Sequence, residues 1–314
     1  MKCSSCDAEL PLPIDPKSQV SMRPCCKEEI VSSGCLPAEE EAQPARPSAH
    51  KTGTDNTGSH SVDFEIEDGV LKKCNCQSKS IVIPDGVTNI GNRAFKDCSH
   101  LVKVTIPDSV TSIGDWAFDN CINLTRIKIS ANVTEIGVGA FLRCKSLTKI
   151  VIPAGVTSIK DAAFSDCNRL VSVMIPAGVT IIGESAFWNC QMLDSIVLPA
   201  GVTSIGKYAF GDCTNLASVM LPASVTSIGD DAFQSCVSLE SIAIPSGVTA
   251  IGDETFDGCE KLEKIAIPDS VTSIGHWAFE GCESLARVYA SPSWKRKNAD
   301  FFAGCPCYRK MCNP

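Results

Sequence analysis

The chain has 314 residues, with 28 Lys and Arg against 36 Asp and Glu, and its formal net charge is −8. Hydrophobic residues make up 44% of the chain and charged residues 20%, a composition that excludes wholesale disorder. No run approaches the about 20 consecutive apolar residues of a membrane-spanning helix, and the net acidity argues against general nucleic-acid binding.

Residues 1–35 hold five of the 19 cysteines and few apolar side chains. A Cys-x-x-Cys pair brings two thiolates to one tetrahedral ion, and a later cysteine pair can close such a site. We predict one zinc ion here, bound by Cys3, Cys6, Cys26 and Cys35, with Cys25 as the alternative to Cys26. The other interpretation is a disordered, thiol-bearing tail without metal. The segment resembles a RING-type or ribbon-type zinc module but lacks a second Cys-x-x-Cys.

Two short regions follow. Residues 36–61 are rich in Pro, Ala, Glu, Ser, Thr and Gly and have no apolar period, which is typical of a disordered linker. Residues 62–82 include Phe64, Ile66 and Leu71. We expect this segment to be an atypical first unit that caps the array after it, because the open end of a repeat array needs covering.

A 23-residue repeat dominates the rest of the chain. Nine full units fill 83–289, and a tenth, decayed copy leads into a predicted C-terminal cap at 290–314. One phenylalanine series runs from Phe95 to Phe302 at this spacing, and one cysteine series runs from Cys98 to Cys305. A period of this length is the mark of a solenoid, in which each unit covers the apolar face of its neighbour.

One unit predicts its own local structure. The alternation at the end of 101–106 favours a short strand with one buried face, and Pro107 ends it because proline has no N–H to pair. Gly114 permits a backbone corner. Asp115 is expected to cap a short helical turn over 116–120. The Phe and Cys series should point inward, and we interpret the cysteines as core residues rather than a redox or metal ladder.

The unit C-x-x-L-x-x-[IV]-x-[IL]-P-x-x-V-T-x-I-G-x-x-A-F-x-x resembles leucine-rich repeats, and the phrase IPDSVTSIGDWAFDNC (106–121) resembles the BspA-like class. The resemblance covers about three-quarters of the chain, residues 78–305. It implies an α/β fold: a right-handed leucine-rich repeat solenoid with a parallel β-sheet on the concave side and short helical turns opposite. It also implies protein interaction or adhesion rather than catalysis.

The residues that flank the central aliphatic of each strand should face outward on the concave side. Six of these positions are basic, none is acidic, and the middle of the row is small and apolar with two methionines. The binding residues that this pattern predicts are Lys103, Arg126, Lys128, Lys149, Met174, Met220, Lys264, Arg287 and Tyr289.

The first functional hypothesis is an intracellular, non-enzymatic scaffold whose concave face binds an acidic protein segment or peptide. We expect no secretory signal in MKCSSCDAELPLP, no cofactor for the array, and no nucleic-acid partner, since no aromatic series accompanies the charge. A surface or secreted adhesin is the alternative from another class, and a RING-like ubiquitin-ligase component is the third. Only four histidines occur, His50, His60, His100 and His276, and they suggest no catalytic set.

Overall fold

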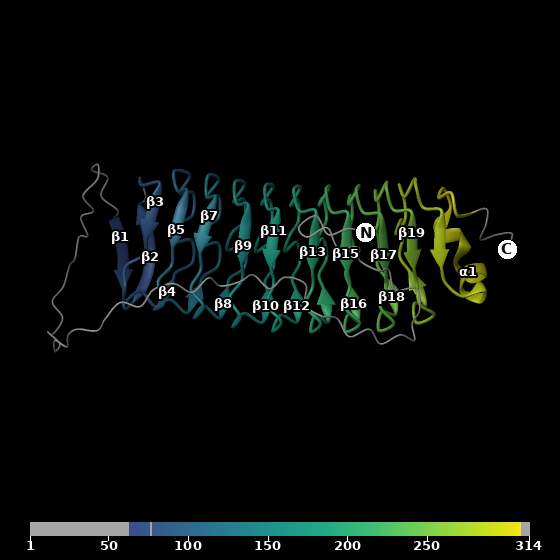
Figure 1. Ribbon diagram of the computed structural model, residues 1–314, viewed down its shortest axis with the longest axis horizontal. Coiled ribbons are helices and arrows are strands. Elements are labelled where there is room, and N and C mark those ends of the chain that lie inside the picture. The colour runs from purple at the N-terminus through teal and green to yellow at the C-terminus, as the bar shows by residue number, and fades with distance from the viewer. Residues whose placement is uncertain (1–62, 76, 309–314) are drawn as a thin grey trace, which may run out of the picture. The chain divides into compact units, whose positions relative to one another are not determined.

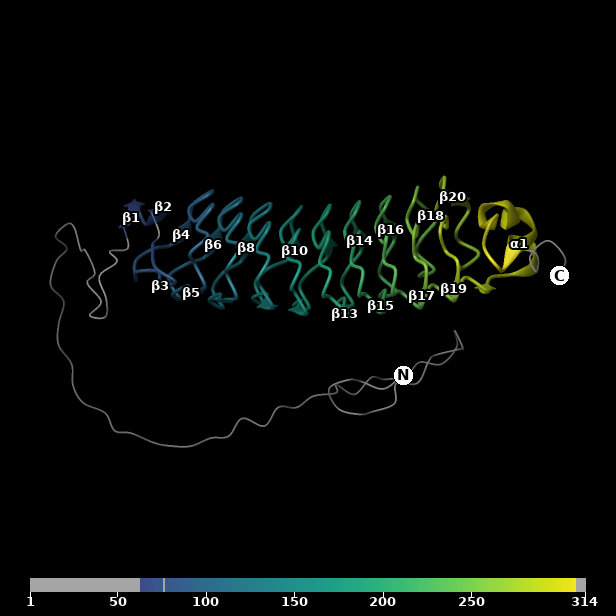
Figure 2. The ribbon, with the colours of Figure 1, turned by 90° about the horizontal axis from the view of Figure 1, so that it is seen from above.

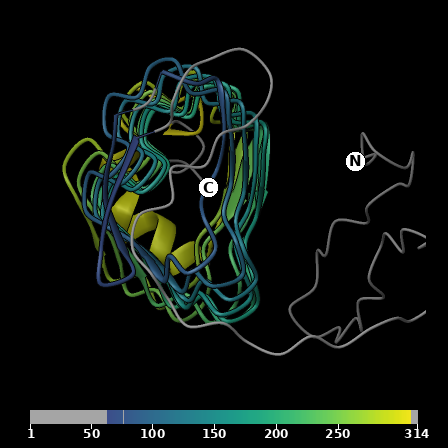
Figure 3. The ribbon, with the colours of Figure 1, turned by 90° about the vertical axis from the view of Figure 1, so that its left-hand side faces the viewer.

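The computed structural model describes residues 63–75 and 77–308. These residues form a solenoid of short parallel strands whose coils follow one another in sequence order along one axis (Figures 1 and 2). Seen along that axis, the coils lie over one another with the same outline (Figure 3). The predicted leucine-rich repeat solenoid and its parallel sheet are therefore confirmed.

Each coil contributes one three-residue strand to the first parallel row, which we call the long strands. Their central residue is less exposed than its two neighbours in nearly every coil. Backbone ladders join them in three consecutive groups, β3 to β7, β9 to β11 and β13 to β21. The long strands are β3 (Ser80–Val82), β5 (Lys103–Thr105), β7 (Arg126–Lys128), β9 (Lys149–Val151), β11 (Ser172–Met174), β13 (Ser195–Val197), β15 (Ser218–Met220), β17 (Ser241–Ala243), β19 (Lys264–Ala266) and β21 (Arg287–Tyr289).

A second row of two-residue strands, which the sequence pattern did not predict, lies further along each coil. The second residue of each strand, such as Ile113, is buried, so this row anchors the other wall of the core. The short strands are β4 (Asn89–Ile90), β6 (Ser112–Ile113), β8 (Glu135–Ile136), β10 (Ser158–Ile159), β12 (Ile181–Ile182), β14 (Ser204–Ile205), β16 (Ser227–Ile228), β18 (Ala250–Ile251) and β20 (Ser273–Ile274).

The two ends of the solenoid are formed by different elements. At the N-terminal end β1 (Asp63–Glu67) and β2 (Val70–Asn75) form an antiparallel hairpin, and β2 pairs with β4. At the other end come α1 (Pro292–Asn298) and η1 (Ala299–Phe302). Trp294 of α1 donates its indole N–H to the Val271 carbonyl at 2.7 Å and packs edge-on against Phe302. The helix is thereby joined to the last full coil.

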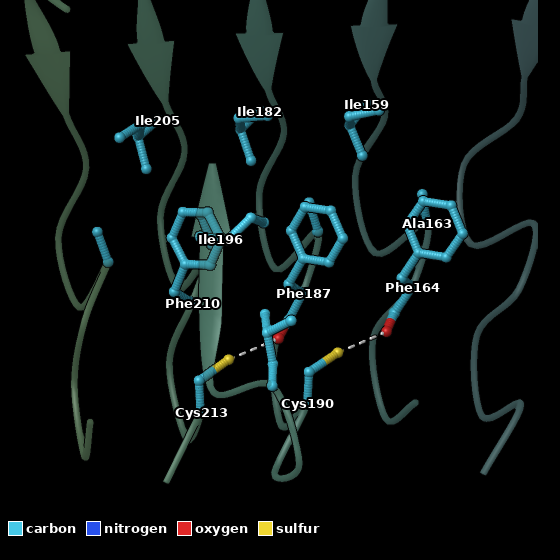
Figure 4. Close-up of a cluster of buried hydrophobic side chains, with 14 of the residues drawn as sticks. Ile159, Ala163, Phe164, Ile182, Phe187, Cys190, Ile196, Ile205, Phe210 and Cys213 are labelled. Carbon is cyan, nitrogen blue, oxygen red and sulfur yellow. Dashed lines mark hydrogen bonds between the residues drawn. The ribbon is translucent and has the colours of Figure 1, made fainter. Parts of the chain in front are cut away.

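The core is a continuous stack of phenylalanine rings, one from each coil (Figure 4). All ten rings from Phe95 to Phe302 are buried. Between Phe118 and Phe279 successive ring centroids lie 5.3–5.6 Å apart, and their planes differ by at most 12°. Each ring therefore covers the next, and no coil could bury its own ring alone.

The segment predicted as a helical turn, 116–120, is not helical. It forms a run of tight turns in which alternate N–H groups bond locally, as from Asp119 to the Trp116 carbonyl at 3.1 Å. The remaining N–H groups bond to the next coil, as from Phe118 to the Ala140 carbonyl at 2.8 Å. The positive φ of Trp116 and Asn120, 52° and 61°, is incompatible with a right-handed helix, whose residues all have negative φ. Pairing between coils therefore outcompetes helix formation.

Two predicted roles change for the same reason. Asp115 does not cap a helix: its Oδ1 accepts the N–H of Val138 in the next coil at 2.8 Å. Gly114 is needed for space, since a Cβ there would lie 2.5 Å from Asn92 Oδ1 and 2.7 Å from the Asn92 backbone nitrogen. Both residues serve the close approach of neighbouring coils.

We predict that Phe187→Ala lowers the free energy of unfolding by about 3–5 kcal/mol, because it opens a cavity in the middle of the stack. The exposed Val197→Ala is the matched control and should change it by less than about 0.5 kcal/mol. Urea denaturation followed by circular dichroism measures both. A loss below about 1 kcal/mol for Phe187→Ala would show that the stack contributes little to stability.

Candidate functional site

The outward surface of the long strands is the candidate site, and we call it the long-strand face. It consists of the first and third residues of the ten long strands. In the strand register, each first residue pairs with the first residue of the next strand and each third with the third, so these side chains form two rows across the strands. The first-position row reads Ser80, Lys103, Arg126, Lys149, Ser172, Ser195, Ser218, Ser241, Lys264 and Arg287. The third-position row reads Val82, Thr105, Lys128, Val151, Met174, Val197, Met220, Ala243, Ala266 and Tyr289.

Six cations stand on this face without a carboxylate partner among the described residues. Lys103, Arg126, Lys128, Lys149 and Arg287 are exposed, and Lys264 is half-buried. Lys103 lies directly beside Arg126 in the strand register, and Lys264 lies beside Arg287. Like charges on directly opposed strand positions destabilise a sheet. The face therefore carries electrostatic repulsion that an anionic ligand would relieve.

Three cations on the turn segments show the opposite arrangement, because each contacts a buried aspartate. Asp119 is almost fully buried. It accepts hydrogen bonds from Nε and Nη2 of Arg143 at 2.7–3.0 Å, and one of its oxygens lies 3.2 Å from Nζ of Lys96. The hydrogen bond to Asp119 raises the pKa of Arg143. Lys207 lies 3.3 Å from the buried Asp231 in the same way. These ion pairs, which we call clamps, join successive coils. Lys96, Arg143 and Lys207 therefore stabilise the solenoid.

Sequence reasoning missed both clamps, because Asp119 and Asp231 look like the surface acids of other units. The sequence does contain a signal for these pairs, because each acid has a cation 23 or 24 residues away, which is about one repeat unit. Since each such pair spans one repeat, its members face each other across adjacent coils.

An exposed apolar row continues the cationic part of the face. Val151, Met174, Val197 and Met220 occupy the third position of four consecutive long strands and are 59%, 62%, 79% and 61% exposed. Tyr289 ends the row, with 53% of its surface exposed. Large apolar side chains gathered at such exposure mark contact surfaces more often than scattered ones do. The two valines belong to this surface together with the predicted methionines.

Two of the three tryptophans in the repeat units, Trp116 and Trp188, are half-buried against the next coil. A Cβ on Gly139 would lie 2.6 Å from a Trp116 ring carbon, and one on Gly211 would lie 3.1 Å from a Trp188 ring carbon. These rings therefore cover the glycine of the next coil. Trp277 is 64% exposed but lies on the turn segment, away from the long-strand face.

The cysteine ladder is buried, as predicted, and has a bonding role that the sequence did not reveal. From Cys121 to Cys282 each thiol donates to the phenylalanine carbonyl of the preceding coil at 3.1–3.3 Å, as Cys190 and Cys213 do in Figure 4. Burial raises the pKa of Cys213 and of Cys282 to about 12. Because the thiolate is the nucleophile and the metal ligand, these thiols are poorly suited to either chemistry.

The zinc ligands predicted at Cys3, Cys6, Cys26 and Cys35 lie outside the described residues, so that site stays a prediction. Within 63–75 and 77–308, no three or more His, Cys, Asp and Glu side chains are placed to hold a metal ion. In the same part of the chain, no helix is long and apolar enough to cross a membrane.

Comparison with known proteins identifies one family. A family model described as BspA type leucine rich repeat region matches residues 65–194 and 189–308. No curated protein sequence matches the chain.

Several solved structures of bacterial repeat proteins are similar. A leucine-rich repeat protein from Bacteroides ovatus is 26% identical, with 72% of this chain and 79% of that chain covered and a TM-score of 0.46. One from T. pallidum is also 26% identical, with 78% and 95% covered and a TM-score of 0.41. A leucine rich cell surface protein from Faecalibacterium prausnitzii is 30% identical, with 78% and 96% covered and a TM-score of 0.33.

The raised thiol pKa values predict alkaline destabilisation. Below pH 9 both states hold the Cys213 proton; above it the unfolded chain loses that proton, while the folded chain keeps it until about pH 12. This thiol's contribution to stability is therefore lost as pH rises from 9 to 12, by about 1.4 kcal/mol per pH unit.

Denaturation of the parent and of Cys213→Ala, in reducing buffer at a series of pH values, measures this effect. Between pH 9 and 12 the unfolding free energy of the variant should fall less steeply than that of the parent, by about 1.4 kcal/mol per pH unit. The difference between the two proteins isolates the thiol from lysines and tyrosines that titrate in the same range. Parallel profiles would contradict the assignment.

Proposed function

We propose that this chain, which is a member of the BspA-type leucine-rich repeat family, is a non-enzymatic protein-interaction scaffold. The long-strand face binds an acidic segment of a partner protein. Extended surfaces of this kind are the usual binding surfaces of solenoids. The six cations hold the partner's carboxylates, and the exposed valines and methionines contact its apolar side chains.

The single observation that supports this proposal most is the distribution of ion pairs. All five ion pairs among the described residues lie off the long-strand face, while the six cations on that face have no acidic partner there. Cations that served only solubility would be expected with acids interspersed, yet no outward position of the ten long strands is acidic. A row of cations without acids is instead complementary to an anionic partner.

The non-enzymatic assignment is supported by how the reactive groups are used. The ladder thiols bond to carbonyls in the core, and the buried acids hold coils together. His100 and His276 belong to distant coils. Among the described residues the ladder thiols and the buried acids form no nucleophile–base pair of the kind that catalysis requires. The Ser99 hydroxyl lies 3.5 Å from Nδ1 of its exposed neighbour His100, at the limit of a hydrogen bond.

We predict that changing the six cations of the face to Ala abolishes binding of an acidic peptide, here a fluorescent polyglutamate. Binding by the parent should weaken as salt rises, since exposed charge pairs are screened over about 8–10 Å at physiological ionic strength. Fluorescence anisotropy titrations at low and high salt measure both effects.

A matched control removes the same charge from other surfaces. It changes four lysines and two arginines that are exposed and lie off the long-strand face: Lys73, Lys145, Lys261, Lys297, Arg169 and Arg296. This variant should keep at least half of the parent's affinity. Equal loss in both variants would mean that net charge alone attracts the peptide, and binding that persists in both would place the site elsewhere.

The surface-adhesin alternative is separated from the intracellular scaffold by the chemical state of the protein in its own cells. We propose the intracellular location, which predicts reduced ladder thiols and unmodified Asn123 and Asn132, the two sequon asparagines. Their side-chain amides donate to the Ser99 and Asp108 carbonyls, each at 2.8 Å. Mass spectrometry of the purified native protein tests this. Disulfide-linked ladder cysteines or glycans on either asparagine would favour the adhesin.

A further inference from the structure

We propose that the partner segment bound by the long-strand face is an amphipathic α-helix that lies along the row of coils and crosses the strands. Its acidic end lies over β5, β7 and β9, and its apolar stripe lies over β9 to β15. This inference rests on the proposed function and specifies the conformation and the direction of the ligand.

The direction follows from how the side chains are arranged. Lys103, Arg126 and Lys149 are the same position of three consecutive strands, and Val151, Met174, Val197 and Met220 are the same position of four. Each long strand has only three residues, so a ligand aligned with one strand meets at most two outward side chains. A ligand that follows the row of coils meets all seven.

The conformation follows from the repeat distance. Hydrogen-bonded strands are about 4.8 Å apart, and the phenylalanine rings beneath are 5.3–5.6 Å apart through the middle of the row. Residues on one face of an α-helix recur every three or four residues, about 4.5–6 Å along its axis. Residues on one face of an extended chain recur about every 6.6 Å. Only the helix stays in step with successive coils.

The apolar row is shaped for such a helix. Its four side chains are more than half exposed. The in-strand neighbours of the last three at the first position are the small serines Ser172, Ser195 and Ser218, and that of Val151 is Lys149. The methionines are unbranched and adapt to the shape of a bound side chain. Five steps from β5 to β15 span about 24–27 Å, the length of a helix of about 16–18 residues.

The acidic end is assigned to the first coils because the cations there are more numerous and more accessible. Lys103, Arg126, Lys128 and Lys149 are all exposed, whereas Lys264 near the other end is half-buried. Exposed glutamates, Glu240 and Glu263, directly precede β17 and β19. An acidic ligand is therefore attracted more strongly at the earlier coils than at the later ones.

Two synthetic peptides of about 18 residues and identical composition test the inference. One has glutamates in its first two turns and leucines at helical spacing after them. The other has the glutamates and leucines at alternate positions, as in a strand. We expect the helical pattern to bind at least about tenfold more tightly, a difference of about 1.4 kcal/mol, and to gain helical circular dichroism on binding.

The methionines report where the peptide lies. Methyl NMR signals of Met174 and Met220 should shift on binding, whereas that of Met192, which is 47% exposed but outside the long strands, should not. The variant Lys103→Ala/Arg126→Ala should weaken binding by at least about tenfold, while Lys264→Ala/Arg287→Ala, which removes the same two residue types, should weaken it by less than about threefold.

The outcomes separate this inference from the function on which it rests. If the alternating peptide binds as tightly as the helical one and both depend on Lys103 and Arg126, the face binds acidic segments but not as helices. If a proline in the middle of the helical peptide leaves its affinity unchanged, the helix is likewise excluded. If replacing the cations of the face by alanine changes the affinity for neither peptide, the proposed function is contradicted as well.

Discussion

Stacking of like residues on like residues is the constraint on which this solenoid depends. Each phenylalanine ring is covered by the ring of the next coil, and each phenylalanine carbonyl accepts a thiol from that coil. A coil of 23 residues has no interior of its own, so its apolar groups are buried only when a neighbour is in place. Every inward position is therefore held to the same small set of residues, and any slip in spacing would expose the core on both sides.

The same constraint leaves the outward positions of the long strands free to vary, so these positions can be adapted to a partner. The inward residues of the long strands hardly change from coil to coil, while the outward ones change from lysine and arginine to serine, valine and methionine. Where cations help the coils hold together, buried aspartates neutralise them. Where they stand on the long-strand face, no acid of the described residues does so. Structural charges and charges available to a partner are thus distinguished by their surroundings rather than by residue type.

The long-strand face was accessible to sequence reasoning because strand geometry is local. Alternation about Val104, with Lys103 and Thr105 on the other side, needs only the period of two that any strand has. The turn segment was not accessible in this way. Its alternate N–H groups bond to the next coil, a partner 22 residues away, so local propensity for a helical turn was outweighed. The buried clamp on Asp119 was hidden for the same reason, since Lys96, Asp119 and Arg143 belong to three consecutive coils.

The sequence by itself determined that this chain is a solenoid, where its coils begin and end, which residues enter the core and which face outward on the strands. Periodicity and alternation carry that information because they describe each unit alone. Only the tertiary structure decided that the second wall of the core is a row of short strands and that Asp115 and Gly114 serve contacts between coils. It also decided that the cations of the long-strand face have no acidic partner within 63–75 and 77–308. These depend on distances between side chains of different coils, which no single unit contains.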